Sequence, residues 1–326
     1  MNFSTPVVLP TAKKIIDYND SLLILGSCFA ENIGEKLASN KFNTVVNPFG
    51  IIYNPIAVAN GLKYVLDEKL FQTSDLIYFN DKWLSLQHHG SFSNRDKTVC
   101  LSNINHSIKS AHKQLKQATY LFITFGSAWV YEHKEHGLVA NCHKIPAKHF
   151  SKRLLKVDEI VAAYKSLIKS IKNINTDINV VFTVSPVRHT KDGLWENNLS
   201  KSLLHLSIKE LKDNFDNCTY FPAYEIVMDE LRDYRFFKDD LVHPSDLAVN
   251  YVWEKFSSCY FSETTIALMG NIQKIKQAAM HKPFDFNSEK HQLFIKNQMD
   301  IIKKLNIQFP QLNFEEEKLR LFSEKQ

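Results

Sequence analysis

Apolar segments of strand length recur along the chain and alternate with segments of helical periodicity. The strand-like runs are rich in β-branched and aromatic residues and cover 21–26, 43–46, 119–126, 178–186 and 218–223. Three helical stripes lie between them: Phe29, Ile33 and Leu37; then Leu154, Ile160, Val161, Tyr164, Leu167, Ile168 and Ile171; then Leu203, Leu206, Ile208 and Leu211. Strands that alternate with helices favour βαβ units. The pattern therefore predicts a three-layer α/β/α fold around a mostly parallel central sheet.

Two regions depart from this alternation. Residues 51–95 contain several turn residues and short apolar runs, which predicts an irregular insertion of small strands and loops. From Ser262 onward the chain is rich in Lys and Glu, has helical periodicity, and is interrupted at "HKPFDFN". We therefore expect one domain over 1–261 and a helical C-terminal extension over 262–326, available for packing, dimerisation or docking of a partner.

Composition narrows the function classes. The net charge of +5 comes from Lys and Arg residues that are spread along the chain, as on a solvated surface, so we expect no nucleic-acid partner. The chain has no run of about 18 apolar residues, so we expect no membrane span and no membrane partner. The N-terminus lacks the pattern of a signal peptide. The five cysteines are an odd number without a CxxC pair, which favours reduced thiols in the cytoplasm. Composition does not indicate an oligomeric state.

The stretch "LLILGSCFAENIGEKL" places two candidate nucleophiles at the exit of an apolar strand. The strand ends at Gly26 and runs directly into a helix, so Ser27 and Cys28 lie at the carboxyl edge of the sheet, where ligands bind in open α/β folds. A helix N-terminus lowers the pKa of a thiol there, and its free N–H groups hold an oxyanion. Taken alone, the stretch is read more simply as a buried cysteine beside an N-cap serine.

A second element lies far downstream in "FFKDDLVHPSDLAVNYVWEKF". Asp240 precedes His243 by three residues in a polar turn, and Ser245 is an N-cap candidate for the helix that follows. A carboxylate so placed accepts the Nδ1 proton of the imidazole and leaves Nε2 free as a base. A surface ion pair is the alternative for an isolated DxxH. A nucleophile after the first strand and a DxxH before the last helix of the domain form a recognisable chain order.

The motifs in this order resemble those of the GSCFA family, which is placed with the SGNH (GDSL-like) esterase and acyltransferase superfamily. The resemblance covers about residues 20–260 and rests on "GSCFA", "NPFGIIYNP", "FGSAWVY", "VANCHKIP", "SPVRH", "YFPAYEI" and "LRDYRFFKDDLVHPS". It implies an SGNH or flavodoxin-like fold. It also implies an ester hydrolase or acyltransferase that forms a covalent acyl-enzyme without a cofactor, on an O-acyl small-molecule or glycan substrate.

The superfamily's first motif reads GDS, and its serine is the nucleophile. Laid on this motif, Gly26 matches the glycine, Ser27 the aspartate and Cys28 the nucleophile. A shift of one residue makes Ser27 the nucleophile instead, but Gly26 then loses its match. The superfamily's last motif is DxxH, so the resemblance makes His243 the base and Asp240 the residue that orients it.

In the superfamily, the nucleophile's N–H, a glycine N–H and an asparagine side chain form the oxyanion hole. By resemblance, Gly50 is the glycine donor and Gly126 belongs to the third motif, in which Ala128 stands where the asparagine belongs. One donor is therefore missing, and the loss of one such donor lowers a rate by about 10²–10³. Asn141 and His143, in the loop that follows, are the candidate replacements.

Further candidates follow the strand at 178–186. Ser185 and Arg188 lie at its carboxyl end, so we expect them to contact the substrate, with Arg188 or His189 facing an anionic group. The remaining histidines are dispersed and lack HExxH or HxH spacing, so we expect no metal site. A non-catalytic binding module on a degenerate fold is the rival hypothesis, which Ala128 favours.

Overall fold

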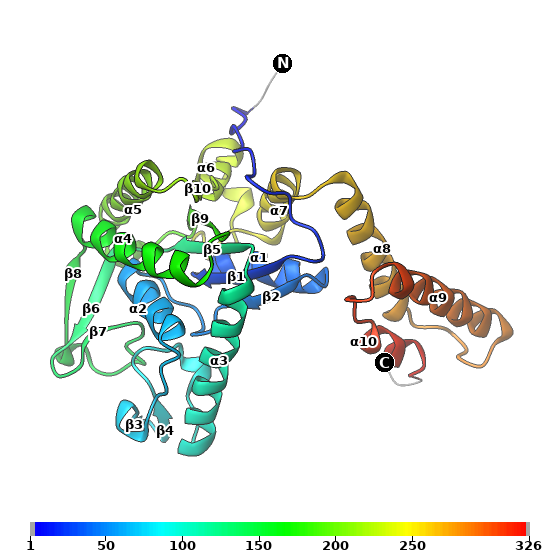
Figure 1. Ribbon diagram of the computed structural model, residues 1–326, viewed down its shortest axis with the longest axis horizontal. Helices are drawn as coiled ribbons and strands as arrows, with labels where there is room; N and C mark the ends of the chain where they lie inside the picture. Colours follow the sequence, from blue (N-terminus) through cyan, green and yellow to red (C-terminus); the bar gives the residue numbers. More distant parts are fainter. Residues whose placement is uncertain (1–3, 324–326) are drawn as a thin grey trace.

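A five-stranded parallel sheet forms the centre of the molecule. The computed structural model describes residues 4–323 and orders the strands β10-β9-β5-β1-β2, with every neighbouring pair parallel (Figure 1). The strands are β1 (Ser21–Gly26), β2 (Asn43–Val46), β5 (Tyr120–Phe125), β9 (Asn179–Val184) and β10 (Cys218–Tyr220). All five correspond to predicted strands, so the parallel sheet is confirmed.

Helices cover both faces of this sheet. Alternate side chains of β1 enter two separate cores, Leu23 and Leu25 on one face and Leu22 and Ile24 on the other. The first core packs α2 (Pro55–Leu66), α3 (Lys97–Gln117), α4 (Val157–Ile174) and α5 (Leu194–Asn214). The second packs α1 (Cys28–Ser39), α6 (Ala223–Glu225), the π-helical turn Ile226–Leu231 and α7 (Asp246–Tyr260). The three-layer prediction is confirmed.

Two predicted helical stripes need correction. Leu154 belongs to a strand, β8 (Phe150–Leu154), and not to helix α4. On α5, Leu206 is 55% exposed, whereas Leu204, Ile208 and Leu211 are buried. The helix is rotated from the predicted face because its buried side also carries polar residues, Asn197, Ser200, Lys201 and Ser207. The prediction used only the apolar positions of this segment and therefore placed the buried face of α5 incorrectly.

The prediction for residues 51–95 is wrong in its first part. Helix α2 begins at Pro55, capped by Asn54, whose Oδ1 accepts a hydrogen bond from the Ala57 N–H at 2.7 Å. An N-cap asparagine before a proline at N1 is a favourable helix start. The rest is irregular, as expected: a hairpin of β3 (Ile77–Phe79) and β4 (Lys82–Leu84) with 3₁₀ turns at Thr73–Asp75 and Gly90–Phe92.

A small antiparallel sheet beyond β5 was not predicted. It is ordered β7-β6-β8 and consists of β6 (Trp129–His133), β7 (Gly137–Val139) and β8. Further 3₁₀ turns lie at Ala147–His149, Thr190–Asp192 and Tyr234–Phe236. The short strands of this sheet stand at the side of the molecule, next to α4 (Figure 1).

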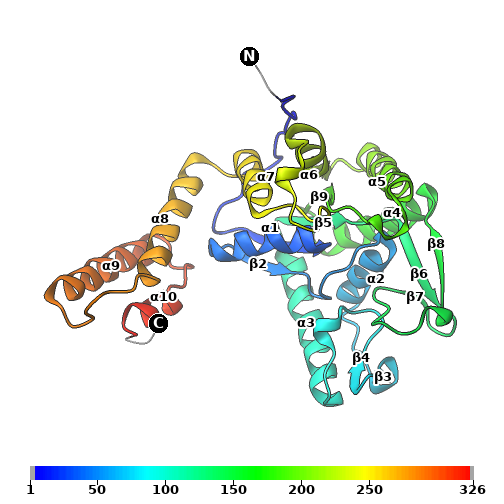
Figure 2. The ribbon, with the colours of Figure 1, turned by 180° about the vertical axis from the view of Figure 1, so that it is seen from behind.

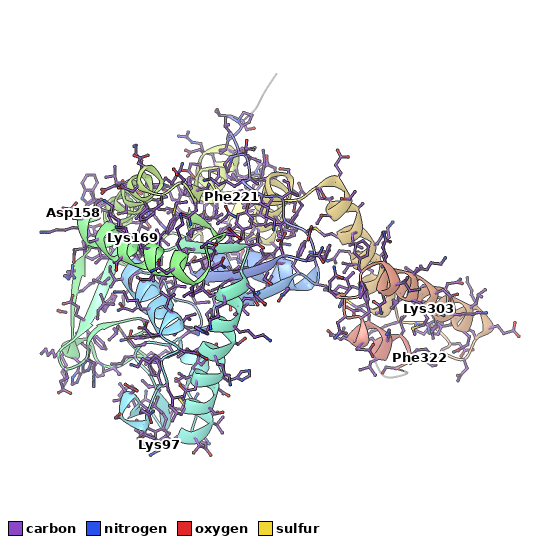
Figure 3. The ribbon with its side chains drawn as sticks, in the orientation of Figure 1. Lys97, Asp158, Lys169, Phe221, Lys303 and Phe322 are labelled. Carbon is purple, nitrogen blue, oxygen red and sulfur yellow. The ribbon has the colours of Figure 1, made fainter. Side chains whose placement is uncertain are left out.

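The C-terminal region is helical, as predicted. It consists of α8 (Glu263–Ala279), α9 (Glu289–Gln308) and α10 (Glu315–Leu321), with the break over 280–288. Two views show α9 and α10 to one side of the α/β body, reached through α8 (Figures 1 and 2). Lys303 and Phe322 lie on this arm, apart from the body that holds Phe221 (Figure 3). The division into domains at 261 stays a prediction.

The base of the arm is tied to helix α1. Lys276 Nζ donates to the Ser39 carbonyl at 3.0 Å, and Gln273 Nε2 donates to Asn40 Oδ1 at 2.8 Å. Among the described residues, no helix is both long enough and apolar enough to cross a membrane.

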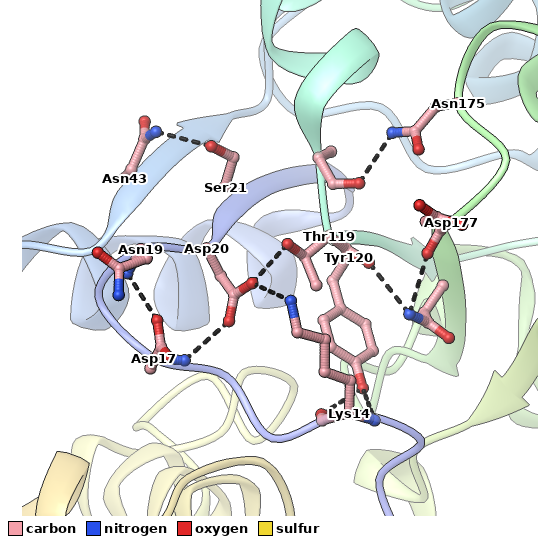
Figure 4. A network of polar contacts seen from close by, with 12 residues as sticks. Lys14, Asp17, Asn19, Asp20, Ser21, Asn43, Thr119, Tyr120, Asn175 and Asp177 are labelled. Carbon is pink, nitrogen blue, oxygen red and sulfur yellow. Dashed lines mark hydrogen bonds and ion pairs between the residues drawn. The ribbon is translucent and has the colours of Figure 1, made fainter.

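Polar side chains close the amino edge of the sheet (Figure 4). The Asp20 carboxylate is 4% exposed and accepts hydrogen bonds from Lys14 Nζ and Thr119 Oγ1, each at 2.6 Å, and from the Asp17 N–H at 2.9 Å. Tyr120 Oη donates to the Lys14 carbonyl at 2.6 Å. This edge therefore buries a carboxylate whose oxygens are hydrogen-bonded.

Candidate active site

A glycine elbow connects β1 to α1 at the carboxyl edge of the sheet. Gly26 has φ +137°, and a Cβ atom there would lie 2.1 Å from the Thr124 carbonyl oxygen. No L side chain fits this position, so the strand turns abruptly into the helix. The Gly26 N–H donates to Asn47 Oδ1 at 2.9 Å, which holds the elbow in place.

The two candidate nucleophiles at the elbow, Ser27 and Cys28, differ in their access to the cavity. Ser27 is the N-cap of α1 and is 1% exposed; its Oγ accepts a hydrogen bond from the Phe29 N–H at 3.3 Å. Cys28 is the first helical residue and lines a cavity of about 660 Å³. The structure therefore brings Cys28 to open space, and the alternative placement of Ser27 as nucleophile is contradicted by its burial and its capping role.

The expectation that the helix terminus lowers the pKa of Cys28 needs correction. Burial raises the pKa of the Cys28 thiol, and this effect exceeds the lowering by the backbone N–H groups of Phe29 and Cys28. Glu31 raises this pKa further, and Lys201 lowers it. In the resting structure the thiol form is thus favoured, and a base is needed to generate the thiolate.

The DxxH loop has the geometry of a histidine held by a carboxylate. His243 Nδ1 lies 2.7 Å from Asp240 Oδ2. Asp240 Oδ1 accepts hydrogen bonds from the backbone N–H groups of Val242 and His243, both at 2.9 Å. These two N–H groups, His243 first, and the imidazole lower the pKa of the Asp240 carboxyl well below its usual range. The carboxylate therefore stays ionised, and it fixes the proton of the neutral imidazole on Nδ1.

His243 lines the same cavity as Cys28. Within residues 4–323, no hydrogen bond joins His243 to Cys28. Cys28 and His243 are 215 positions apart in the chain and line one cavity from different elements. Catalytic hydrogen bonds are often long in an empty site and shorten when substrate binds.

Arg188 was predicted to contact the substrate, and it also anchors the DxxH loop. Its guanidinium donates to the Leu241 carbonyl, and its backbone N–H donates to the Val242 carbonyl at 3.3 Å. The guanidinium carbon lies 4.8 Å from the Phe237 ring centroid and 5.3 Å from that of Tyr234. Arg188 lines the cavity beside His243.

The two glycines predicted at the oxyanion hole have no free N–H group. The Gly50 N–H donates to the Asn47 carbonyl at 2.7 Å, and the Gly126 N–H donates to the Tyr53 carbonyl at 2.8 Å. A Cβ at Gly126 would lie 3.4 Å from the Ser27 Cβ, so this glycine allows close packing against the elbow. The donor role predicted for Gly50 is therefore wrong in this structure.

The two candidate replacements for the missing donor, Asn141 and His143, differ in whether they have a free N–H group. Asn141 lines the cavity; its Oδ1 accepts a hydrogen bond from the His143 N–H at 2.8 Å, which leaves its amide Nδ2 as the free end. His143 instead hydrogen-bonds through Nε2 to the Ser85 carbonyl at 2.9 Å, and burial lowers its pKa. A neutral imidazole that donates from Nε2 has only an acceptor at Nδ1, so His143 is contradicted as an oxyanion donor.

Ser185 is fully buried and does not line the cavity. Its N–H donates to the Phe125 carbonyl at 2.8 Å, and its Oγ accepts from the Val187 N–H at 3.3 Å. The predicted substrate contact is therefore corrected to a structural role at the end of β9. His189 does line the cavity, but burial lowers its pKa to about 4, so it does not offer a cation to an anionic group at neutral pH.

Sequence analysis missed Asn54, a second asparagine on the cavity. Asn54 is 5% exposed, and its Oδ1 is held by the N-cap bond to Ala57. In the described part of the chain its Nδ2 has no hydrogen bond. The loop before it is joined to the elbow, since the Ile52 N–H donates to the Gly26 carbonyl at 2.9 Å. The pair Asn54-Pro55 was the available signal.

Lys201 was also missed. It is 2% exposed on α5, and its Nζ donates to the carbonyls of Gly126 at 2.7 Å and Ser185 at 2.6 Å. Its position three residues before Leu204 and seven before Ile208 places a lysine on the buried face of the helix. That spacing was the available signal.

Aromatic side chains from the unpredicted sheet form one wall of the cavity. Trp129 and Tyr131 of β6 line it, and Tyr53 lines it from the loop before α2. Lys152 Nζ lies 4.6 Å from a Trp129 ring centroid and forms an ion pair with Asp192, at the same cavity. Over residues 4–323, no group of three or more His, Cys, Asp or Glu side chains is arranged to hold a metal ion.

Comparisons with known proteins identify the family. The GSCFA family matches residues 21–256, and the GSCFA domain protein, C-terminal domain, matches residues 272–324. No curated protein matches the chain. A solved structure, a carbohydrate esterase family 3 from Talaromyces cellulolyticus, is similar at 8% identity and a TM-score of 0.35, covering 77% of this chain and 99% of that one. A likeness this low carries no conclusion about chemistry. The family match spans most of the chain, and the protein belongs to the GSCFA family.

Proposed function

We propose that this protein is an SGNH-like ester hydrolase or acyltransferase that works through a thioester at Cys28. The observation that carries the proposal is that Cys28 and His243 line one cavity while Asp240 holds the other nitrogen of the imidazole at 2.7 Å. A nucleophile, a base and a group that orients the base are the parts that acyl transfer needs.

In the proposed reaction, His243 Nε2 removes the thiol proton and the sulfur attacks the acyl carbonyl carbon. The carbonyl electron pair moves to oxygen, then returns as the bond to the leaving alcohol breaks, and His243 gives the alcohol its proton. In the second half, His243 removes a proton from water or from an acceptor hydroxyl. That oxygen attacks the thioester carbonyl, the carbon–sulfur bond breaks, and the proton returns to sulfur. A thioester retains acyl-transfer energy, which favours transfer where a hydroxyl acceptor excludes water.

The oxyanion of each step needs hydrogen-bond donors near Cys28. The backbone N–H groups at the start of α1 are one source, since the first N–H groups of a helix have no partner within it. The Asn54 amide is the second, because its Oδ1 is fixed and its Nδ2 is free at the cavity. Asn141 offers the same group at the same cavity. Asn54 thus supplies the donor that Ala128 cannot.

The substrate is an O-acyl compound, and the wall of Trp129 and Tyr131 suits a sugar or another small hydroxyl compound, whose apolar face packs on aromatic rings. We also propose that the protein acts in the cytoplasm without a cofactor, and without a nucleic-acid or membrane partner.

A non-catalytic binding module is the second candidate. One observation favours it: burial raises the pKa of the Cys28 thiol, so the sulfur is not a thiolate on its own. The two functions differ in whether His243 activates this sulfur.

Acylation of Cys28 by an activated ester tests the proposal. Cys142 lines the same cavity, whereas Cys100, Cys218 and Cys259 are buried. The experiment therefore compares wild type, Cys142→Ala and Cys28→Ala, with p-nitrophenyl acetate as the acyl donor and intact mass as the readout. We expect one added acetyl group in wild type and in Cys142→Ala, and none in Cys28→Ala. Equal acetylation and turnover in Cys28→Ala would reject Cys28 as the nucleophile; no acetylation in any of the three would favour the binding module.

A further inference from the structure

The DxxH loop, residues 238–243, buries little side-chain surface. Five of its six residues are exposed, and Val242 is half-buried. Inside the loop, the Lys238 N–H donates to the His243 carbonyl, and the Leu241 N–H donates to the Lys238 carbonyl, both at 2.8 Å. Packing therefore does little to fix the place of this loop, and the contacts that reach it from outside decide where His243 lies.

Arg188 supplies the hydrogen bonds that reach the loop from outside. Its guanidinium donates to the Leu241 carbonyl, and its backbone N–H donates to the Val242 carbonyl at 3.3 Å. Within residues 4–323, every other hydrogen bond of the loop joins two of its own residues, and one exposed ion pair, Lys238 with Asp246, leaves it. Because Arg188 follows β9, it ties the loop to the end of a central strand.

The guanidinium is itself held in one place. Its carbon lies 4.8 Å from the Phe237 ring centroid and 5.3 Å from that of Tyr234, and its Nε is buried. Phe237 precedes the loop and forms a β-bridge with Pro244, which closes the base of the loop. A planar guanidinium packed on aromatic rings loses little freedom when it donates a hydrogen bond. One side chain therefore contacts both the base of the loop and Leu241 within it.

The guanidinium binds the loop at a strained residue. Leu241 has φ +56°, a left-handed conformation that is unfavourable for leucine because its Cβ atom crowds the backbone. Its side chain is 50% exposed, so packing does not compensate. Strained residues persist where neighbouring contacts hold them, and they gather at functional sites. Leu241 follows Asp240 directly and precedes His243 by two positions, so the bond from Arg188 lies between the two members of the DxxH pair.

We infer that Arg188 is a positioning residue that fixes the DxxH loop so that the His243 imidazole lines the cavity of Cys28. The inference rests on the proposed function, because Arg188 acts here through His243. In this role Arg188 binds no part of the substrate and transfers no proton. The role differs from the expectation that Arg188 contacts the substrate, and experiment can separate the two.

The test is the acetylation of Cys28 over a range of p-nitrophenyl acetate concentrations, which separates the rate at saturation from the half-saturating concentration. All proteins carry Cys142→Ala, so that Cys28 is the cysteine that lines the cavity. Arg188→Met removes the charge and the guanidinium hydrogen bond, whereas Arg188→Lys keeps a charge and a donor. Lys191→Met is the matched control: Lys191 lines the same cavity, but no hydrogen bond of the described chain joins it to the loop.

Arg188→Met should slow acetylation at saturation by about 10²-fold, because a catalytic group misplaced by about 1 Å loses about that factor. The half-saturating concentration should stay at the wild-type value. Arg188→Lys should recover part of the rate, and Lys191→Met should keep all of it. A wild-type rate in Arg188→Met, or an equal loss in Lys191→Met, overturns the inference.

A double variant shows whether Arg188 acts through His243. Once His243→Ala has removed the base, Arg188→Met should cause no further loss of acetylation rate. Losses that multiply in the double variant would mean that the two residues act independently, and the inference would be wrong.

Substrate binding by Arg188 predicts a different result. The ester 4-acetoxybenzoate carries a carboxylate, whereas p-nitrophenyl acetate is neutral. If Arg188→Met raises the half-saturating concentration of 4-acetoxybenzoate and leaves the acetylation rate with p-nitrophenyl acetate unchanged, Arg188 binds an anionic group and does not position the loop. An equal loss of saturating rate with both esters supports positioning.

Tyr234→Ala replaces the Arg188 variants if neither of them folds. Tyr234 is 63% exposed, so the change spares the core but removes one of the two rings on which the guanidinium packs. We expect slower acetylation at saturation and no further loss in combination with His243→Ala; a wild-type rate overturns the inference. If Cys28 is not acetylated with Arg188 in place, or if His243→Ala keeps the full rate, the proposed function fails instead, and the inference falls with it.

Discussion

The two edges of the central sheet each bury an ionisable side chain, but only the one at the amino edge has an oppositely charged partner. At the amino edge, the Asp20 carboxylate receives hydrogen bonds from the Lys14 ammonium, the Thr119 hydroxyl and the backbone of Asp17. At the carboxyl edge, the Lys201 ammonium has two carbonyl oxygens, and no carboxylate of the described chain pairs with it.

This difference in pairing indicates which edge of the sheet is stabilised for the fold and which is the candidate for chemistry. A buried charge that is paired and hydrogen-bonded contributes to holding the fold, whereas one without a counter-charge raises the free energy of the resting state. Loss of the proton relieves the second situation, and burial accordingly lowers the pKa of Lys201 to about 7. Lys201 lies at the same carboxyl edge of the sheet as Cys28.

Among the changes that leave Cys28 in place, His243→Ala should cause the largest loss of acetylation rate. Without the base, the rate of acetylation of Cys28 should fall by about 10²–10⁴-fold at neutral pH, because a positioned base contributes about that factor. The measurement is the rate of mass gain with p-nitrophenyl acetate. His106→Ala, at an exposed histidine on α3, is the control and should keep the wild-type rate. An unchanged rate in His243→Ala would remove this histidine from the proposal.

Asn54→Ser should have the next largest effect. Serine still caps α2, so the helix start remains, but the amide donor is lost and acetylation should slow by about 10²–10³-fold. Alkylation by iodoacetamide, which forms no oxyanion, should keep its rate. Asn141→Ser is the matched comparison at the same cavity. If Asn141→Ser slows acetylation and Asn54→Ser does not, the donor comes from Asn141.

Asp20→Ala should leave the chemistry intact and weaken the fold. The change leaves the Thr119 hydroxyl and the Asp17 N–H without their acceptor, which lowers the free energy of unfolding by about 1–3 kcal/mol. Denaturant unfolding measures this loss, and the acetylation rate per folded molecule should match the wild type. Asn19→Ala, at an exposed neighbour on the same edge, is the control. A slower acetylation rate with unchanged stability would contradict the division of roles between the edges.

Local pattern was enough to place Cys28 at the elbow and to form the DxxH loop. Gly26 ends an apolar strand and tolerates no side chain, so the turn into α1 follows from residues that are neighbours in the chain. Asp240 and His243 are also close in sequence, and their hydrogen bond needs only the local turn. Their catalytic roles stay predictions.

The oxyanion donors were misjudged because hydrogen-bond partners come from distant segments. His143, one of the predicted donors, is held by the Ser85 carbonyl, 58 positions away in the chain. Asn54 and Lys201 were missed for the same reason, since burial and unpaired atoms become visible only after α2 and α5 pack against the sheet.

The order of apolar and polar residues determined the parallel sheet, the elbow at Gly26 and the existence of a helical C-terminal region, because periodicity and glycine conformation act over a few neighbouring residues. Tertiary structure decided which sulfur or hydroxyl faces the cavity, which N–H groups stay free and which lysine is left without a counter-charge. Those properties depend on desolvation and on partners contributed by segments far apart in the chain, and no local pattern encodes them.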